Sequence, residues 1–88
     1  MAFIIANHKV ADFTKWKPYF DSDKKRQSDA GLKLVKVGRK SDDPNDVYMI
    51  WETKDPTGFK SMLKDQGLAD IMKQAGVMSE IKWVIVND

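Results

Sequence analysis

The chain has 88 residues, of which 42% are hydrophobic and 32% are charged, and its formal net charge is +2. These proportions are ordinary for a soluble globular protein, and a nearly neutral charge indicates no nucleic acid or other polyanionic partner. The absence of cysteine excludes disulfide bonds and thiolate metal sites. We expect one cytoplasmic domain over residues 1–88, because the apolar start of the chain is too short to span a membrane and lacks the basic region of a signal peptide.

The first two predicted elements are a strand and a helix. Residues 2–8 are predicted to form the strand, because they are rich in β-branched and aromatic side chains and end in polar residues. Asp12 is the expected N-cap of the helix, since a carboxylate can accept hydrogen bonds from the free N–H groups of the first turn. The buried stripe of this helix has apolar residues at helical spacing, namely Phe13, Trp16 and Phe20.

The next predicted elements are the end of this helix and a hairpin. Pro18 lacks an N–H group, so the helix should kink there or end and restart there. Gly31 should close the helix in the left-handed conformation. Residues 32–40 are predicted to form a strand whose lysines suit a sheet edge. The Asp, Pro and Asn residues of 41–46 are typical of a turn, and residues 47–53 return as the next strand.

The last predicted elements are a divided helix and a strand. Asp55-Pro56 indicates a helix start, Gln66-Gly67 should divide this helix in two, and Gly76 should end its second piece. Residues 80–86 are the last predicted strand. The resulting order, βαββαβ, predicts a ferredoxin-like α+β fold, which is a four-stranded antiparallel sheet with helices on one face. Right-handed crossovers place the first and third strands in the centre of that sheet.

The predicted central strands are apolar on both sides. Consecutive residues such as Phe3-Ile4-Ile5 and Met49-Ile50-Trp51 cannot all face one core, because side chains alternate along a strand. The predicted helices suffice for one face of the sheet. We therefore expect a second copy of the chain to cover the other face and form a homodimer, with a pocket between the sheet and its cover.

Alternation also assigns the faces of the third strand. Tyr48, Ile50 and Glu52 share one side. An unpaired carboxylate under packed helices would cost several kcal/mol, so we expect these three residues on the open face. Met49 and Trp51 then belong to the helix-covered core.

The topology predicts a group of chemically useful residues at one end of the sheet. We expect these residues to surround one mouth of the open face, namely His8, Asp12, Trp16, Arg39 and Tyr48. An imidazole with an unperturbed pKa of roughly 6.5 suits proton transfer near neutral pH. Simpler interpretations stay open, since His8 can be a structural group, Asp12 a helix cap only, and Trp16 a core aromatic.

Several specific chemistries are excluded by missing motifs. The chain has no glycine-rich phosphate-binding loop and has one histidine, so a pair of histidine metal ligands is impossible. The segment 7–12 has no glycine, which an acylphosphatase anion cradle needs after the first strand. The strand 47–52 lacks the aromatic signature of an RNA-recognition domain.

The stretch His8–Asp21 resembles the H-x-V-x-D-(F/Y)-x-x-W-x-x-x-F-D opening of small bacterial dimeric α/β-barrel proteins, which are labelled antibiotic-biosynthesis-monooxygenase-like or cyclase-like. The similarity continues through residues 42–47, through Trp51-Glu52 and through residues 68–77. The resemblance implies a ferredoxin-like protomer whose sheet packs against that of a partner. Some members oxidise aromatic polyketide-type substrates without metal or flavin, and others steer cyclisations.

The leading functional hypothesis is a homodimer that holds a small apolar or aromatic molecule. As an enzyme it would act without a cofactor, as an oxygenase or cyclase. His8 would move protons, Asp12 would fix the imidazole, and Tyr48 would orient the substrate. Further ligand contacts are expected from Trp16, Phe20, Arg39, Ile50 and Glu52. The alternatives are a non-catalytic ligand-binding or stress-response barrel, and an open-faced domain that docks another protein or RNA.

Overall fold

The computed structural model describes all 88 residues, from Met1 to Asp88, as eight helices and strands. The strands are β1 (Ala2–Lys9), β2 (Lys33–Lys40), β3 (Asp43–Thr53) and β4 (Lys82–Asn87). The helices are α1 (Phe13–Ser22), α2 (Lys24–Asp29), α3 (Thr57–Met62) and α4 (Gln66–Gln74). None of these helices is both long enough and apolar enough to cross a membrane.

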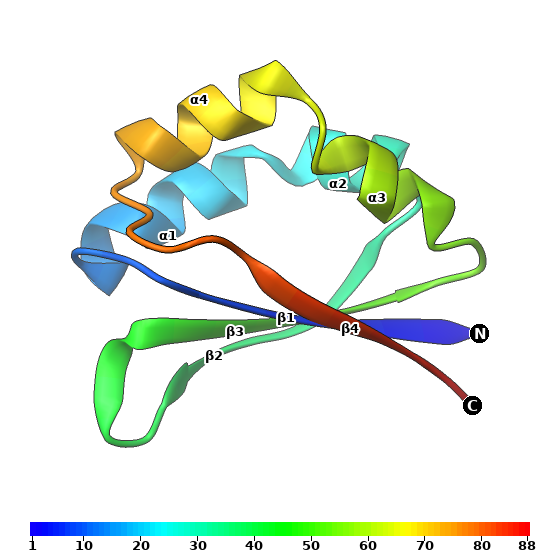
Figure 1. Cartoon of the computed structure of the whole chain (residues 1–88), viewed down its shortest axis with the longest axis horizontal. Coiled ribbons are helices and arrows are strands. Elements are labelled where there is room, and N and C mark those ends of the chain that lie inside the picture. The colour runs from blue at the N-terminus through cyan, green and yellow to red at the C-terminus, as the bar shows by residue number, and fades with distance from the viewer.

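The strands form one antiparallel sheet in the order β2-β3-β1-β4, and all four helices lie on one face of it (Figure 1). This arrangement confirms the predicted ferredoxin-like fold and the central position of the first and third strands. The register of β1 and β3 places Ile4 opposite Trp51 and Ile5 opposite Ile50. Apolar pairs therefore cross the centre of the sheet on both of its faces.

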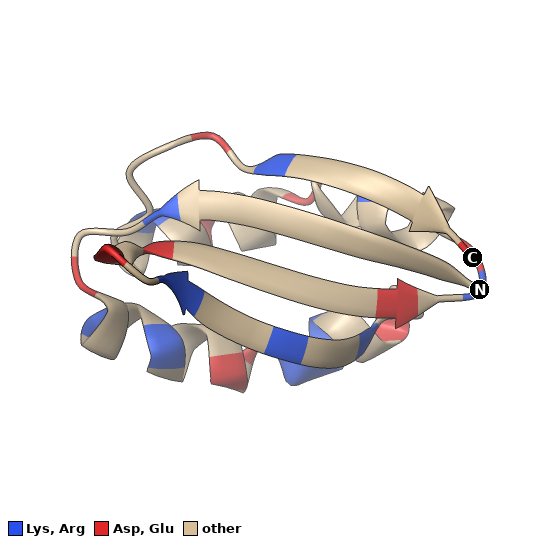
Figure 2. Ribbon diagram, turned by 90° about the horizontal axis from the view of Figure 1, so that it is seen from below, with Lys and Arg blue, Asp and Glu red and all other residues tan.

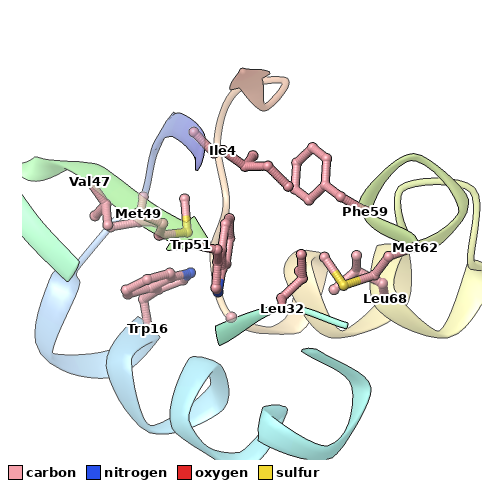
Figure 3. Close-up of a cluster of buried hydrophobic side chains, with 12 residues drawn as sticks. Ile4, Trp16, Leu32, Val47, Met49, Trp51, Phe59, Met62 and Leu68 are labelled. Atoms are coloured by element: carbon pink, nitrogen blue, oxygen red, sulfur yellow. The ribbon is translucent and has the colours of Figure 1, made fainter. Parts of the chain in front are cut away.

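The helix-covered face of the sheet forms the core. Every second residue of β1 is buried there, including Ile4 and Ala6, and the same holds for β3. Met49 and Trp51 belong to this side, as predicted from strand alternation. Figure 3 shows these side chains meeting Trp16 from α1, while Phe59, Met62 and Leu68 come from the second pair of helices.

The opposite face of the sheet has no cover within the chain (Figure 2). It carries Phe3, Ile5 and Ile50, which are half-buried by their neighbours in the sheet. Val84 and Val86 on β4 lie in the same rows and are 51% and 44% exposed. An apolar surface of this kind is contiguous over several strands, and such surfaces on soluble domains mark interaction sites.

The ends of α1 and α2 agree with the sequence in part. Asp12 caps α1, and Gly31 has a φ of +77°, the left-handed conformation expected of it. The helix does not end and restart at Pro18, which lies inside α1, so that alternative is wrong. The break falls at Asp23, whose backbone is non-helical and whose N–H donates to the carbonyl of Phe20, three residues back.

Three other predicted boundaries move. The first hairpin turn is shorter than residues 41–46, because β3 begins at Asp43, which pairs with Lys40. The second long helix breaks before Asp65, not at Gln66-Gly67, because the Asp65 carboxylate accepts a hydrogen bond from the Gly67 N–H at 2.8 Å and starts α4. The last strand begins at Lys82, two residues later than expected. Gly76 follows α4 with a φ of +83°, as expected.

One glycine fixes how two helices meet. A Cβ atom at Gly58 would lie 2.1 Å from the carbonyl oxygen of Ala30, which is far inside van der Waals contact. The start of α3 therefore packs directly on the backbone that follows α2. This contact makes α2 and α3 a closely joined pair.

We predict that Gly58→Ala destabilises the fold by about 1–3 kcal/mol or more, because the added methyl group overpacks this contact. Gly38→Ala is the matched control, since a Cβ atom there meets nothing within 4 Å. Its free energy of unfolding should stay within about 0.5 kcal/mol of the original. Urea unfolding measures both variants, and equal effects would contradict the close contact at Gly58.

Candidate functional site

The structure encloses a cavity between the sheet and the helices. Its volume is about 50 Å³, measured as the space open to the centre of a water-sized sphere, and its walls are mostly apolar. The walls come from β1 and β3 of the sheet and from all four helices, so both layers of the fold contribute to them. The lining residues used below are His8, Trp16, Tyr19, Phe20, Asp23, Gln27, Met49, Trp51, Leu68, Ile71 and Met72.

His8 is the most unusual group in this cavity. It is the fourth buried residue in the alternating pattern of β1, so its ring points toward the helices, and it is 3% exposed. Its ring packs edge-on against Trp16, with centroids 5.5 Å apart and planes at 86°. Neither Nδ1 nor Nε2 has a hydrogen-bond partner. Buried polar atoms without a partner are rare in folded proteins, and each one calls for an explanation.

Burial also sets the charge of His8. Loss of water around the ring lowers its pKa from the ordinary 6.5 to about 4, although the carboxylate of Asp46 acts in the opposite direction. The imidazole is therefore neutral at physiological pH. A neutral imidazole has one N–H donor and one nitrogen acceptor. Neither is used by another group of the protein, and the ring belongs to the wall of the cavity.

Asp46, which influences this pKa, is held by another residue. Its carboxylate accepts a hydrogen bond from the side-chain amide of Asn7, and the same amide donates to the carbonyl of Val47 at 3.1 Å. Asp46 is buried. This carboxylate therefore acts on His8 through its charge, without a hydrogen bond to the ring.

The aromatic wall of the cavity is continuous. Trp16 stacks on Phe20 with centroids 4.9 Å apart and planes at 29°, and Phe20 lies 6.2 Å from Trp51. The indole N–H of Trp51 donates to Oε1 of the buried Gln27 at 3.2 Å. Gln27 thus satisfies the one polar atom of Trp51 and fixes its ring. Flat aromatic walls of this kind suit a planar ring as a ligand.

Asp12 has a different place from the one expected. Its carboxylate accepts hydrogen bonds from the Thr14 N–H at 2.9 Å and the Thr14 hydroxyl at 2.7 Å. These bonds lower the pKa of Asp12. The expectation that Asp12 fixes the imidazole is wrong, because both nitrogens of His8 lack a partner. Asp12 starts α1 and does not join the cavity.

The other predicted site residues are divided between the two faces of the sheet. Tyr48, Ile50 and Glu52 lie on the open face, as predicted, and face away from the cavity. Arg39 lies over the Phe13 ring, 4.6 Å from its centroid, at the edge of the helix-covered side. The expected mouth that joins Tyr48 to His8 therefore does not exist. Alternation along β1 places His8 on the same side as Ile4 and Ala6, opposite to Tyr48.

Two polar residues near the cavity were missed by the sequence analysis. Asp46 was expected in the turn 41–46 but lies within β3, where its carboxylate accepts from Asn7. Gln27 lies on α2 and is buried against Trp51, which no local pattern indicates. No group of three or more His, Cys, Asp or Glu residues lies close enough together to hold a metal ion.

Comparisons with known proteins show the fold. No protein-family profile and no curated protein sequence matches the chain significantly. A candidate antibiotic biosynthesis monooxygenase from Bordetella bronchiseptica is similar with a TM-score of 0.76 at 10% identity, covering 99% of this chain and 95% of the other. Protein Atu4242 from Agrobacterium tumefaciens gives 0.71 at 11%, covering 99% and 92%. SnoaB, a cofactor-independent oxygenase from Streptomyces nogalater, gives 0.69 at 13%, covering 99% and 91%.

These structures confirm, at the level of the fold, the resemblance read from residues 8–21. The chain has the fold of antibiotic-biosynthesis-monooxygenase-like proteins over its whole length. The comparisons show the fold alone, so they assign no role to the cavity or its residues.

The pKa of His8 predicts how stability depends on pH. The folded protein takes up a proton there near pH 4, whereas the unfolded chain takes it up near 6.5. The contribution of His8 to the free energy of unfolding should be fully present above pH 6.5. As the pH falls from neutral to about 5, the free energy of unfolding should fall by about 2 kcal/mol. Urea unfolding across this range measures the slope.

The matched variant for this experiment is His8→Leu, which has no titrating group at this position. Its stability should change little over the same pH range. An original protein with the same shallow slope as the variant would show that His8 keeps an ordinary pKa in the fold.

Proposed function

We propose that the cavity binds a small aromatic molecule with an acidic hydroxyl or activated C–H group, and that neutral His8 accepts its proton. The observation that carries this proposal is the pair of unpaired ring nitrogens in an otherwise apolar cavity. Leaving a buried polar group without a partner costs about 1–3 kcal/mol. A ligand that hydrogen-bonds to the ring would recover part of that energy, which apolar side chains cannot do.

The shape of the cavity supports the ligand class. Trp16 and Phe20 offer stacked aromatic surfaces, and Met49 offers a flexible apolar one. A planar ring would bury its apolar area against these walls, while its single acidic group would meet His8. Pockets of this composition bind through apolar area and use a few polar atoms for orientation.

The proposed chemistry is oxygenation without a cofactor. Removal of a proton by His8 makes the bound molecule an electron-rich anion, and the anion itself supplies the electrons that reduce O₂. A CH₂ group activated by an aromatic system would become C=O, with one oxygen atom entering the product and the other leaving as water. The fold shared with SnoaB, which is described as a cofactor-independent oxygenase, supports this reaction class.

The low pKa of His8 is compatible with this role. The imidazole is unprotonated at every pH well above 4, so it is free to accept a proton, although its low pKa makes it a weak base until an anion lies beside it. Once it has accepted one, the imidazolium stands beside the anion that it has just produced. Opposite charges at short distance in an apolar cavity stabilise each other strongly.

The proposal includes a homodimer across the open face of the sheet. Ile50, Val84 and Val86 lie on this apolar face, and the resemblance of residues 8–21 implies that the sheets of two protomers pack together. Tyr48 and Glu52 would then be interface residues. Their position facing away from the cavity supports this assignment over a direct role in the reaction.

The test of the reaction uses anthrone, whose CH₂ group would become C=O, together with O₂, and it measures product formation and oxygen uptake. His8→Leu should lower turnover by about 10²-fold or more, because general bases contribute on that order. The same variant should still bind the substrate through the aromatic walls. Trp16 and Trp51 line the cavity, so quenching of tryptophan fluorescence reports binding.

Asp12→Asn is the control, since it keeps an oxygen for the helix cap and lies outside the cavity. Its turnover should equal that of the original protein. Binding of the substrate by the original protein without any product would contradict the oxygenase assignment. That outcome would favour the alternative of a non-catalytic ligand-binding barrel.

A further inference from the structure

The helical layer is interrupted at two places that lie close to each other (Figure 1). One break is at Asp23, between α1 and α2, and the other is between Leu63 and Asp65, before α4. Figure 1 shows the two breaks on the same side of the layer, with α4 above α1 and with α2 beside α3. The breaks divide the layer into a pair α2–α3 and a pair α1–α4. The pair α1–α4 supplies most of the helical lining of the cavity, and the pair α2–α3 adds Gln27 and Met62.

Arg26 joins the two breaks. Its Nε donates to the Asp23 carboxylate at 3.0 Å, and its Nη1 donates to the carboxylate of Asp65. Asp65 is the residue that caps α4. The guanidinium also lies against the first turn of α4, since a Cβ atom at Gly67 would be 3.2 Å from both of its terminal nitrogens. Glycine at this helical position leaves the room that Arg26 occupies.

Few other interactions hold the N-terminal end of α4. Leu68 is the one buried residue of this helix. The Arg26–Asp65 pair is the only side-chain hydrogen bond or ion pair between α4 or its cap and the α1–α2 segment. The other end of α4 is tied by backbone bonds, because Gly76 accepts from the Ala11 N–H at 2.9 Å. The C-terminal end of α4 is thus tied by backbone bonds. At the N-terminal end, the Asp65 N–H donates to the Met62 carbonyl of α3 at 3.1 Å, and Arg26 supplies the link to the α1–α2 segment.

The helix α4 forms a wall of the cavity through Leu68, Ile71 and Met72. The cavity of about 50 Å³ is a few times larger than the roughly 10–15 Å³ that one water needs by the same measure. A ligand with several fused rings exceeds this space. An outward movement of α4 from α1 would give such a ligand more room.

We infer that Arg26, which lies outside the cavity, determines the size of the ligand that the cavity accepts by holding α4 against the break at Asp23. This inference rests on the proposed function of the cavity. Arg26 is a positioning residue, since it contacts the two breaks and does not line the cavity. Release of Arg26 widens the space between α1 and α4, whereas α2 and α3 stay joined at Gly58.

The experiment compares Arg26→Gln and Asp65→Asn with the control Lys25→Gln. Asparagine keeps the helix cap at position 65 and removes only the charge. Lys25 pairs with Asp29 on the same helix, so its variant loses an equal charge and ion pair without touching α4. The first readout is amide hydrogen exchange. The backbone amides of residues 66–74 should exchange faster in the two test variants and at the original rate in the control. The amides of β1 and β3 should stay protected in all three variants.

The second readout is binding of phenol, 1-naphthol and anthrone, followed by tryptophan fluorescence. The affinity ratio of the three-ring probe to the one-ring probe should rise by about two- to fivefold in the test variants, as the loss of a partly exposed ion pair allows. Equal exchange and equal ratios in Arg26→Gln and Lys25→Gln would overturn the inference. If no probe binds the original protein, the proposed function fails, and the exchange result alone decides whether Arg26 holds α4.

Discussion

The structure depends on one constraint, which is that a single sheet has two apolar faces and helices on one of them only. Ile4 and Ala6 point to one side of β1, while Phe3 and Ile5 point to the other. The chain is too short to supply a second helical layer. The helix-covered face becomes the core and holds the cavity, and the bare face remains an apolar surface that a second copy can bury. The two faces therefore have separate roles.

The separation explains why the cavity is unusual. Its floor is sheet core, so the burial that stabilises the fold also removes water from His8. The same burial that lowers the pKa of the ring leaves its nitrogens without partners. A core that needed only stability would have an apolar residue at this position. Under the proposed function, the imidazole lowers folding stability and supplies a reactive group in an apolar space, as functional sites in proteins often do.

The sequence was sufficient for the fold and for the two faces of β3. Alternation placed Tyr48 and Glu52 correctly, because a carboxylate under the helices would be too costly. The same alternation applied to β1 would have placed His8 under the helices with Ile4, since the pattern of that strand is unbroken up to His8. The predicted site instead grouped residues by nearness along the sheet, without regard to the face on which each one lies.

Other features could not be read from local patterns. Pro18 lies inside α1, and Asp23 at the break accepts a hydrogen bond from Arg26, whose second partner, Asp65, caps a helix that is distant in the sequence. The burial of Gln27 depends on Trp51, which is 24 positions away. A cavity is the space left by such long-range packing. Composition and periodicity indicate which residues are apolar, and the packing of the helices decides which of them enclose a space.

The measurement that tests the two-faced sheet most directly is the mass of the protein in solution by sedimentation equilibrium at micromolar concentration. The account predicts a particle of twice the chain mass of 10.1 kDa. Ile50→Glu places a charge in the centre of the bare face and should give the single chain, with helical and strand content unchanged. Met78→Glu, at a 72% exposed position outside the strands, should stay at twice the chain mass. An original protein that remains a single chain throughout would contradict the account, because its apolar sheet face would then be stable in water.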